Sequence, residues 1–197
     1  MVTLQAGQFR HSPKVIVHRE FACHYSPVLK AAFDSDFKEG QTQIYNLIDA
    51  SDQSVTLLGQ WLYTQRLDVH ISEIGHFEKA RILCELWILA DKLRIPRLQN
   101  TILHQLEAHC EFANVVPTSS IRYIWDNTSP GAGLRRWLLY QIAHHLKTSA
   151  IINHPERFPP DILLELAVYT IDQYSEGSRL GGIAAFNIVD LELKVDD

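Results

Sequence analysis

The stretch that decides the fold of this chain runs from Val15 to Gly40 and reads VIVHREFACHYSPVLKAAFDSDFKEG. Its β-branched beginning predicts a strand over residues 15–19. After a short link, apolar residues recur at the three-to-four spacing of one helical face, at Val28, Leu29, Ala32, Phe33 and Phe37. We therefore expect a strand that passes directly into a helix.

Both ends of this helix carry residues that are typical of helix ends. Ser26 can cap the first turn, and Pro27 suits the first helical position, where a backbone N–H is not needed. Gly40 can take the left-handed conformation that often follows the last helical residue. The helix is therefore predicted to begin at Pro27 and to stop before Gly40.

Length and composition limit the classes of protein to which the chain can belong. Its 197 residues, 46% of them hydrophobic and 21% charged, suffice for a buried core, so we expect one domain with an extension. The net charge is −5, whereas binding of nucleic acid needs a clustered positive field. Direct binding of nucleic acid is therefore not expected.

The N-terminus and the cysteines favour an intracellular protein. No apolar run approaches the roughly 20 residues that cross a bilayer, and the N-terminus lacks the basic-then-apolar pattern of a signal peptide. Cys23, Cys84 and Cys110 are odd in number and far apart in sequence, which is typical of reduced thiols. We expect a soluble protein of the cytoplasm, the nucleus or both, without membrane insertion.

Short strands alternate with helices in the first half of the chain. Val2-Thr3-Leu4 predicts a strand that forms a hairpin with the strand at Val15, and residues 43–48 predict a third strand. Residues 65–76 are polar and predict a loop, which could hold a short strand at 67–69. The alternation is irregular, which is typical of an α+β domain and not of repeated strand-helix units.

Helical periodicity is strongest in the middle of the chain. A helix is predicted after Asp52 because apolar residues follow at Val55, Leu58 and Leu62. A longer helix leads to Ile95-Pro96, where the proline interrupts it and starts a second one. Together these two predict a helical hairpin that reaches Cys110.

Three further amphipathic helices are predicted beyond residue 111, over residues 121–125, 134–145 and 160–174. Trp125 and Trp137 belong to the first two of these helices. Large aromatic residues of this kind either fill a core or contribute strongly to the binding of a partner. Both interpretations stay open for these two tryptophans.

Six sequence motifs follow one another in the order of a known family: Val2-Thr3-Leu4, Val17-His18-Arg19, Ser26-Pro27-Val28-Leu29-Lys30-Ala31-Ala32-Phe33, Phe37-Lys38-Glu39-Gly40, Trp61-Leu62-Tyr63-Thr64 and Leu89-Ala90-Asp91-Lys92-Leu93. With these motifs the chain resembles a BTB/POZ domain of the fungal type, over roughly residues 2–111. Residues 121–128 and 133–136 resemble the segment that follows this domain in many fungal members.

The resemblance implies an α+β fold, a small three-stranded sheet with a cluster of helices, followed by a helical extension. We expect a BTB/POZ domain over residues 1–112, an extension packed on it over 113–176, and a linker with a terminal strand or tail over 177–197. The resemblance also implies a protein-interaction module, for self-association or partner recruitment. A transcription-regulatory scaffold that reaches DNA through a partner is an alternative.

Catalytic residues, cofactor-binding residues and metal ligands are not predicted. Cys23-His24 and His109-Cys110 are adjacent pairs, and adjacent side chains on a helix or strand point apart. An enzyme with a cryptic Cys/His site is therefore the least favoured alternative. His18 matches a histidine that is structural in the family, where the ring forms a hydrogen bond within the fold.

The loop before the helical hairpin holds a candidate partner-binding triplet. BTB/POZ adaptors of cullin-3 ubiquitin ligases often carry a hydrophobic-x-acidic triplet in this region, and Ile71, Ser72 and Glu73 have those residue types. The loop is longer than is usual in the family. A role as a cullin-3 adaptor is therefore a hypothesis that rests on a short motif.

The two ends of the chain bear on self-association. Many family members dimerise through a strand and helix that precede the first strand, whereas this sequence has only Met1 before Val2. We therefore expect a homodimer only through a different interface.

A linker is predicted from Gly177, and the segment after it alternates apolar and charged residues; its apolar members are Val189, Leu191, Leu193 and Val195. This segment could add a strand to a sheet edge, in its own molecule or in a neighbour, or form a disordered acidic tail.

Overall fold

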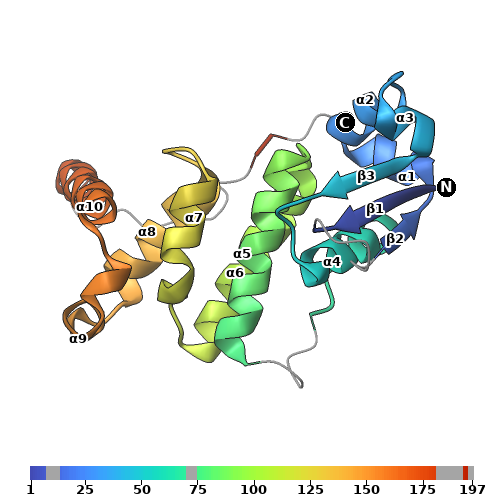
Figure 1. Ribbon diagram of the computed structural model, residues 1–197. Coiled ribbons are helices and arrows are strands. Elements are labelled where there is room, and N and C mark those ends of the chain that lie inside the picture. The colour runs from blue at the N-terminus through green and yellow to red at the C-terminus, as the bar shows by residue number, and fades with distance from the viewer. Residues whose placement is uncertain (8–13, 70–74, 181–192, 195–197) are drawn as a thin grey trace. The chain divides into compact units, whose positions relative to one another are not determined.

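The structure is a computed structural model that describes residues 1–7, 14–69, 75–180 and 193–194 (Figure 1). Two compact units divide the chain. The first unit comprises Met1–Leu106 together with Leu193–Asp197, and the second comprises Glu107–Glu192. Each unit has a buried apolar core of its own.

A three-stranded mixed sheet forms one layer of the first unit, with the strand order β2-β1-β3. The strands are β1 (Val2–Ala6), β2 (Lys14–Val17) and β3 (Ile44–Leu47). β1 pairs antiparallel with β2 and parallel with β3, and its alternate residues Val2, Leu4 and Ala6 are buried. The small sheet and the many helices confirm the predicted α+β fold.

The stretch after β2 contains three short helices where the sequence predicted one. They are α1 (Arg19–Tyr25), α2 (Pro27–Phe33) and α3 (Lys38–Thr42). The predicted direct passage from strand to helix is wrong, because α1 fills the supposed link. Phe37 does not share the inward face of α2 either, since it precedes α3 and is 77% exposed.

Ser26 ties the start of α2 to a distant helix. Its Oγ accepts a hydrogen bond from the Leu29 N–H at 3.1 Å, which confirms the predicted cap, and Pro27 occupies the first helical position. The same Oγ donates to the Leu93 carbonyl oxygen at 2.7 Å. Because Ser26 is fully buried, this contact satisfies a carbonyl group that water could not reach.

Gly40 is necessary for a reason other than the predicted one. It lies inside α3, and the residue with the left-handed conformation after this helix is Gln43, with φ of 55°. A Cβ atom on Gly40 would lie 1.7 Å from the Ser35 carbonyl oxygen. The glycine therefore allows a close approach of two backbone segments.

Three long helices complete the first unit: α4 (Asp52–Thr64), α5 (His76–Lys92) and the first part of α6 (Pro96–Ala113), whose residues from Glu107 onward belong to the second unit. The helical hairpin predicted around Pro96 is confirmed. Residues 66–69 form no strand, although Leu67 is buried. The short strand considered at residues 67–69 is therefore absent, and Leu67 is buried without being part of a strand.

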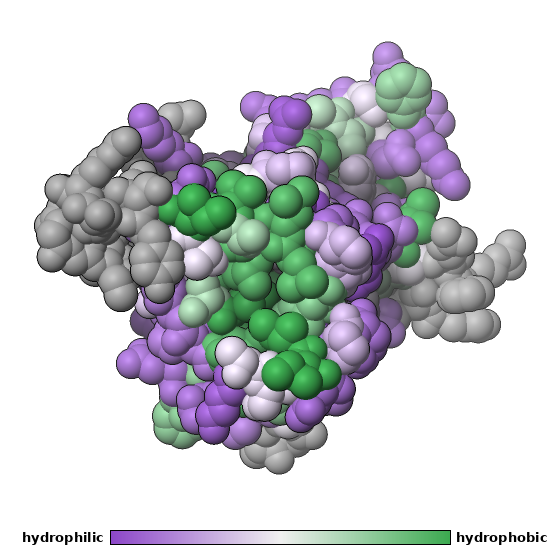
Figure 2. All heavy atoms as spheres, turned by 90° about the vertical axis from the view of Figure 1, so that its left-hand side faces the viewer, coloured by the Kyte–Doolittle hydropathy of each residue, from purple (hydrophilic) through white to green (hydrophobic). Residues whose placement is uncertain are grey.

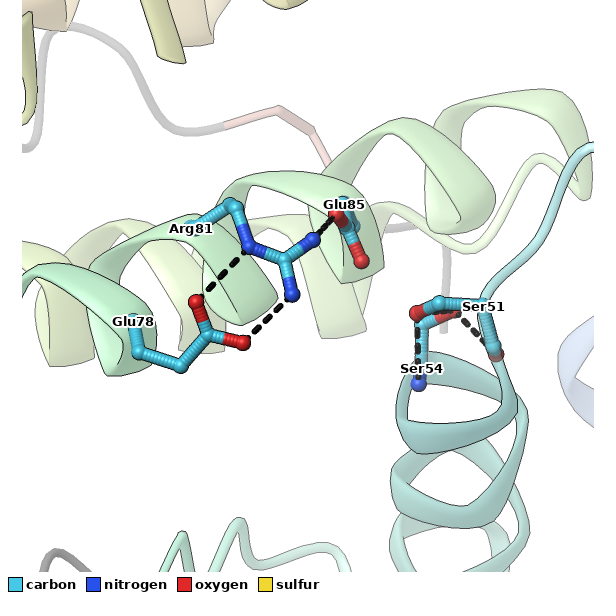
Figure 3. Close-up of polar contacts among 5 residues, drawn as sticks. All are labelled: Ser51, Ser54, Glu78, Arg81 and Glu85. Atoms are coloured by element: carbon cyan, nitrogen blue, oxygen red, sulfur yellow. Dashed lines mark hydrogen bonds and ion pairs between the residues drawn. The ribbon is translucent and has the colours of Figure 1, made fainter. Parts of the chain in front are cut away.

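Figure 3 shows polar contacts at the start of α4 and along the first half of α5. Ser51 Oγ caps α4 by accepting a hydrogen bond from the Ser54 N–H at 3.2 Å. On α5, Arg81 lies between Glu78 and Glu85 and bonds to both carboxylates. The hydrogen bond from Arg81 lowers the pKa of Glu78, so the pair stays charged at neutral pH.

The second unit is helical in its described residues beyond α6. Its α-helices are α7 (Ile121–Asn127), α8 (Gly133–His145), α9 (Thr148–Asn153) and α10 (Pro160–Leu180). Helices α7, α8 and α10 were predicted, whereas the short α9 was not. Helix α10 continues to Leu180, so Gly177, where a linker was expected to begin, lies within it.

The two tryptophans that could have faced a partner lie in the core of the second unit. Trp137 is fully buried, and its Nε1 donates to Glu107 at 2.6 Å. Trp125 is almost fully buried, and its Nε1 donates to Glu165 at 3.1 Å. Each ring therefore fills the core while its polar nitrogen is satisfied by a carboxylate.

Candidate interaction surfaces

Helix α10 carries an apolar face that nothing in the described part of the chain covers. Its exposed members recur at helical spacing: Leu163, Leu164, Val168 and Ile171, which are 40 to 65% exposed. We call these four residues the outer strip. Figure 2 shows an apolar area on the side of the molecule that α10 occupies. An apolar surface with this spacing is typical of a site that binds another protein.

A partly buried ion pair between Arg135 and Glu165 indicates which face of α10 points outward. Glu165 accepts a hydrogen bond from Arg135 of α8 at 2.8 Å, so this side of the helix faces the core. Ile162 lies on the same side and is fully buried. Helical spacing lines up Leu163, Leu166 and Ala167 on one face of this helix, but Leu163 and Ala167 are both exposed. Helix α10 has two apolar faces, and periodicity alone could not tell which one is covered.

Of the predicted partner-binding residues, the structure describes only Leu193. The side chain of Asn100 on α6 holds the backbone of Leu193 through two hydrogen bonds. The others, Ile71, Ser72, Glu73, Val189, Leu191 and Val195, lie outside the described residues. The contact found for Leu193 is with a helix, and strand addition by this segment stays a prediction.

His18 forms the hydrogen bond that the family resemblance implied. Its Nδ1 and the hydroxyl of Tyr63 are 2.8 Å apart, and the His18 N–H donates to the same hydroxyl at 2.9 Å. The ring of Phe21 packs edge-on against both side chains. These contacts join the end of β2 to α4, so His18 has a structural role although its side chain is exposed.

The second unit contains a cavity of about 280 Å³ between α6 and α8. Glu107, Cys110 and Tyr140 line it, with Gln141 donating to Glu107 Oε2 at 2.7 Å. Burial, with a smaller contribution from the charge of Glu107, raises the pKa of the Cys110 thiol to about 12. The pKa of Tyr140 is raised for the same two reasons. At neutral pH both groups therefore stay protonated, and neither is an activated nucleophile.

We predict that the three cysteines differ strongly in reactivity toward a thiol reagent. Cys84 and Cys110 are buried, whereas Cys23 is partly exposed. Desolvation raises the pKa of Cys23, so its labelling should be slow at about pH 7 and faster at about pH 9, as the thiolate fraction increases.

Mass spectrometry after labelling measures this difference. We expect a single adduct at Cys23 in the folded protein and three adducts after denaturation in guanidinium. Rapid labelling of Cys110 in the folded protein would contradict the burial described above and would reopen the hypothesis of a reactive thiol.

Among the described residues, no three His, Cys, Asp or Glu side chains are grouped as metal ligands. In the same part of the chain, no helix is both long enough and apolar enough to cross a membrane.

Comparison with known families agrees with the fold. Residues 2–109 match the family model of the BTB/POZ domain. The match covers more than half of the chain, and the chain belongs to the BTB/POZ family. A search of curated proteins found no match. BTB/POZ domains are as a class protein-interaction modules, whereas the fungal type stays a prediction.

Asn100 and the outer strip were not identified from the sequence as contact residues. The signal for the outer strip was a second set of apolar residues on one helix, at Leu164, Val168 and Ile171. The signal for Asn100 was a residue with low helix propensity inside a long helix, at its fifth position. Both signals are recognisable, but neither one identifies what the residue contacts.

Proposed function

We propose that this BTB/POZ protein is an adaptor that recruits a partner protein through the outer strip of α10. The exposure of Leu164, Val168 and Ile171 on one helical face carries this proposal. Burying such a face against a partner removes apolar surface from water, which is the main source of binding free energy.

Two partners are supported by specific features of the chain. The triplet at residues 71–73 has the residue types found in cullin-3 adaptors. Phe77, the second residue of α5, follows the triplet closely in sequence and is 56% exposed. A second copy of the chain is the other partner, because an apolar strip with i, i+4, i+7 spacing suits the antiparallel packing of two equal helices.

A binding experiment with matched variants tests the proposal. The probes are a purified N-terminal fragment of cullin-3 and the chain itself over a range of concentrations. Val168→Glu places a charge in the middle of the outer strip, and we expect it to weaken the complex at least tenfold, about 1.4 kcal/mol or more. Asp172→Asn changes the charge by one unit on the same helix without removing apolar surface, and should have little effect.

Light scattering and calorimetry separate the outcomes. A complex with the cullin-3 fragment that is lost in both Val168→Glu and Glu73→Lys supports the adaptor function. A mass that rises with concentration only in the wild type supports self-association. Failure to form either complex contradicts both partners, and a complex that Val168→Glu leaves intact shows that the outer strip is not the contact surface.

A further inference from the structure

Two hydrogen bonds join Asn100 of α6 to Leu193, a residue 93 positions further along the chain. Asn100 Nδ2 donates to the Leu193 carbonyl oxygen at 2.9 Å, and the Leu193 N–H donates to Asn100 Oδ1 at 2.8 Å. Residues 193–194 are drawn as the short red segment near α6 in Figure 1. One side chain thus satisfies both backbone groups of a single residue.

This pair of bonds has the pattern that a neighbouring β-strand would supply. A strand residue offers its N–H and its C=O to the same partner in an antiparallel ladder, and the carboxamide of asparagine presents an acceptor and a donor with similar spacing. Asn100 therefore recognises the backbone of Leu193 and not its side chain. In agreement with this, the side chain of Leu193 stays 39% exposed.

Helix propensity gives no reason for an asparagine at position 100, the fifth residue of α6. Asparagine has a low helix propensity, and in helices its side chain usually bonds to nearby backbone groups. Asn127 in α7 does so, donating to the Tyr123 carbonyl oxygen four residues earlier. The bonds of Asn100 described above are instead both to Leu193, which points to a role in holding an extended segment.

The charges on both sides of this contact are complementary. Arg97 precedes Asn100 by three residues and His104 follows it by four, so all three lie on one side of α6, and both flanking residues are exposed. The sequence around Leu193 is acidic, with Asp190, Glu192, Asp196 and Asp197 against one lysine.

We propose that the surface of α6 around Asn100 is a docking site for an extended acidic peptide, and that the chain's own C-terminal segment is its resident ligand. Because Asn100 bonds only to backbone atoms of Leu193, the site can accept different side chains at this position of the peptide. The positive charge of Arg97 favours a peptide with acidic residues. The segment is then held as a separable ligand and not as a permanent part of the core. The proposal is independent of the outer strip, which lies in the other unit.

Hydrogen exchange of the Leu193 amide in the full chain tests the contact itself. In the wild type the amide should exchange at least tenfold more slowly than in Asn100→Ala, because its acceptor is removed in the variant. Alanine is the better helix former, so α6 should stay intact. Asn127→Ala serves as the matched control and should leave the exchange of Leu193 unchanged. Equal exchange in wild type and Asn100→Ala overturns the proposal.

A second measurement tests whether the segment is a separable ligand. Leu193→Pro removes the N–H that donates to Asn100, so the full-length variant should leave the site available. A labelled synthetic peptide of residues 187–197 should bind this variant at least tenfold more tightly than the wild type, with an affinity that falls as salt is added. Binding should be lost in Asn100→Ala/Leu193→Pro.

The remaining outcomes each overturn the proposal. If Leu193 is protected but the peptide does not bind Leu193→Pro, the segment is a fixed part of the fold and not a ligand. If the peptide binds the single variant Leu193→Pro and the double variant Asn100→Ala/Leu193→Pro with equal affinity, Asn100 does not form the binding site. The Val168→Glu test concerns the outer strip, whereas the exchange of Leu193 and the binding of the peptide depend on Asn100. A failure of the proposed adaptor function therefore gives a different set of results from a failure of this site.

Discussion

Replacing Arg135 with alanine is expected to lower the free energy of unfolding by about 3 to 4 kcal/mol, the largest effect of a single polar substitution in the second unit. Arg135 is only 6% exposed. Its guanidinium donates to Glu165 at 2.8 Å, to the Trp125 carbonyl oxygen at 2.7 Å and to the Thr128 hydroxyl at 2.9 Å. Removing it takes this donor from the Trp125 carbonyl oxygen and the Thr128 hydroxyl, and leaves Glu165 with only the hydrogen bond from Trp125 Nε1 among those described above.

The contacts of Arg135 explain why the loss should be large. Residues from α7, α8 and α10 meet at this one side chain, which also packs over the ring of Trp125 at 5.0 Å. Glu165 is about one-third exposed, so water can compensate part of its lost partner. For this reason the expected loss lies in the lower part of the range for a broken buried pair.

Urea unfolding followed by tryptophan fluorescence measures the effect of Arg135→Ala, with Arg136→Ala as the matched control. Arg136 is the next residue on α8 and is exposed, so its removal should change stability by no more than about 0.5 kcal/mol. Glu165→Gln keeps an acceptor oxygen and should have an intermediate effect, about 1 to 2 kcal/mol. Equal losses for Arg135→Ala and Arg136→Ala would show that the buried contacts do not stabilise the unit.

Replacing Gly40 with alanine is expected to destabilise the first unit by about 3 kcal/mol. The new Cβ would lie 1.7 Å from the Ser35 carbonyl oxygen, a distance at which the backbone must move. The segment around Ser35 has little freedom to move, because Ser35 Oγ donates to the Ala32 carbonyl oxygen at 2.7 Å and accepts from the Phe37 N–H at 3.3 Å. The clash should therefore disrupt α3 and its contact with β3.

Lys38→Ala is the control for Gly40→Ala, because it makes the same new residue two positions earlier on α3, where the side chain is exposed. Its effect should stay within about 0.5 kcal/mol. Thermal unfolding of the two variants beside the wild type gives the comparison. A Gly40→Ala protein as stable as Lys38→Ala would show that α3 does not approach the Ser35 backbone closely.

The local features of the fold could be predicted because their causes are local. The cap at Ser26 and the break at Pro96 depend on residues within one helical turn, and both were confirmed. The limits of local patterns are also visible: α1 and α9 are short helices without a clear apolar period, and the sequence did not predict them.

The sequence by itself determined the class of the domain, the order of its strands and long helices along the chain, and the helix starts at Pro27 and Pro96. Only the tertiary structure decided how distant segments meet: that Gly40 touches Ser35, that Arg135 holds α10 with Leu164 and Ile171 outward, and that Asn100 holds Leu193. The physical reason is that periodicity and capping act over a few residues, whereas burial depends on which segment packs from elsewhere in the chain.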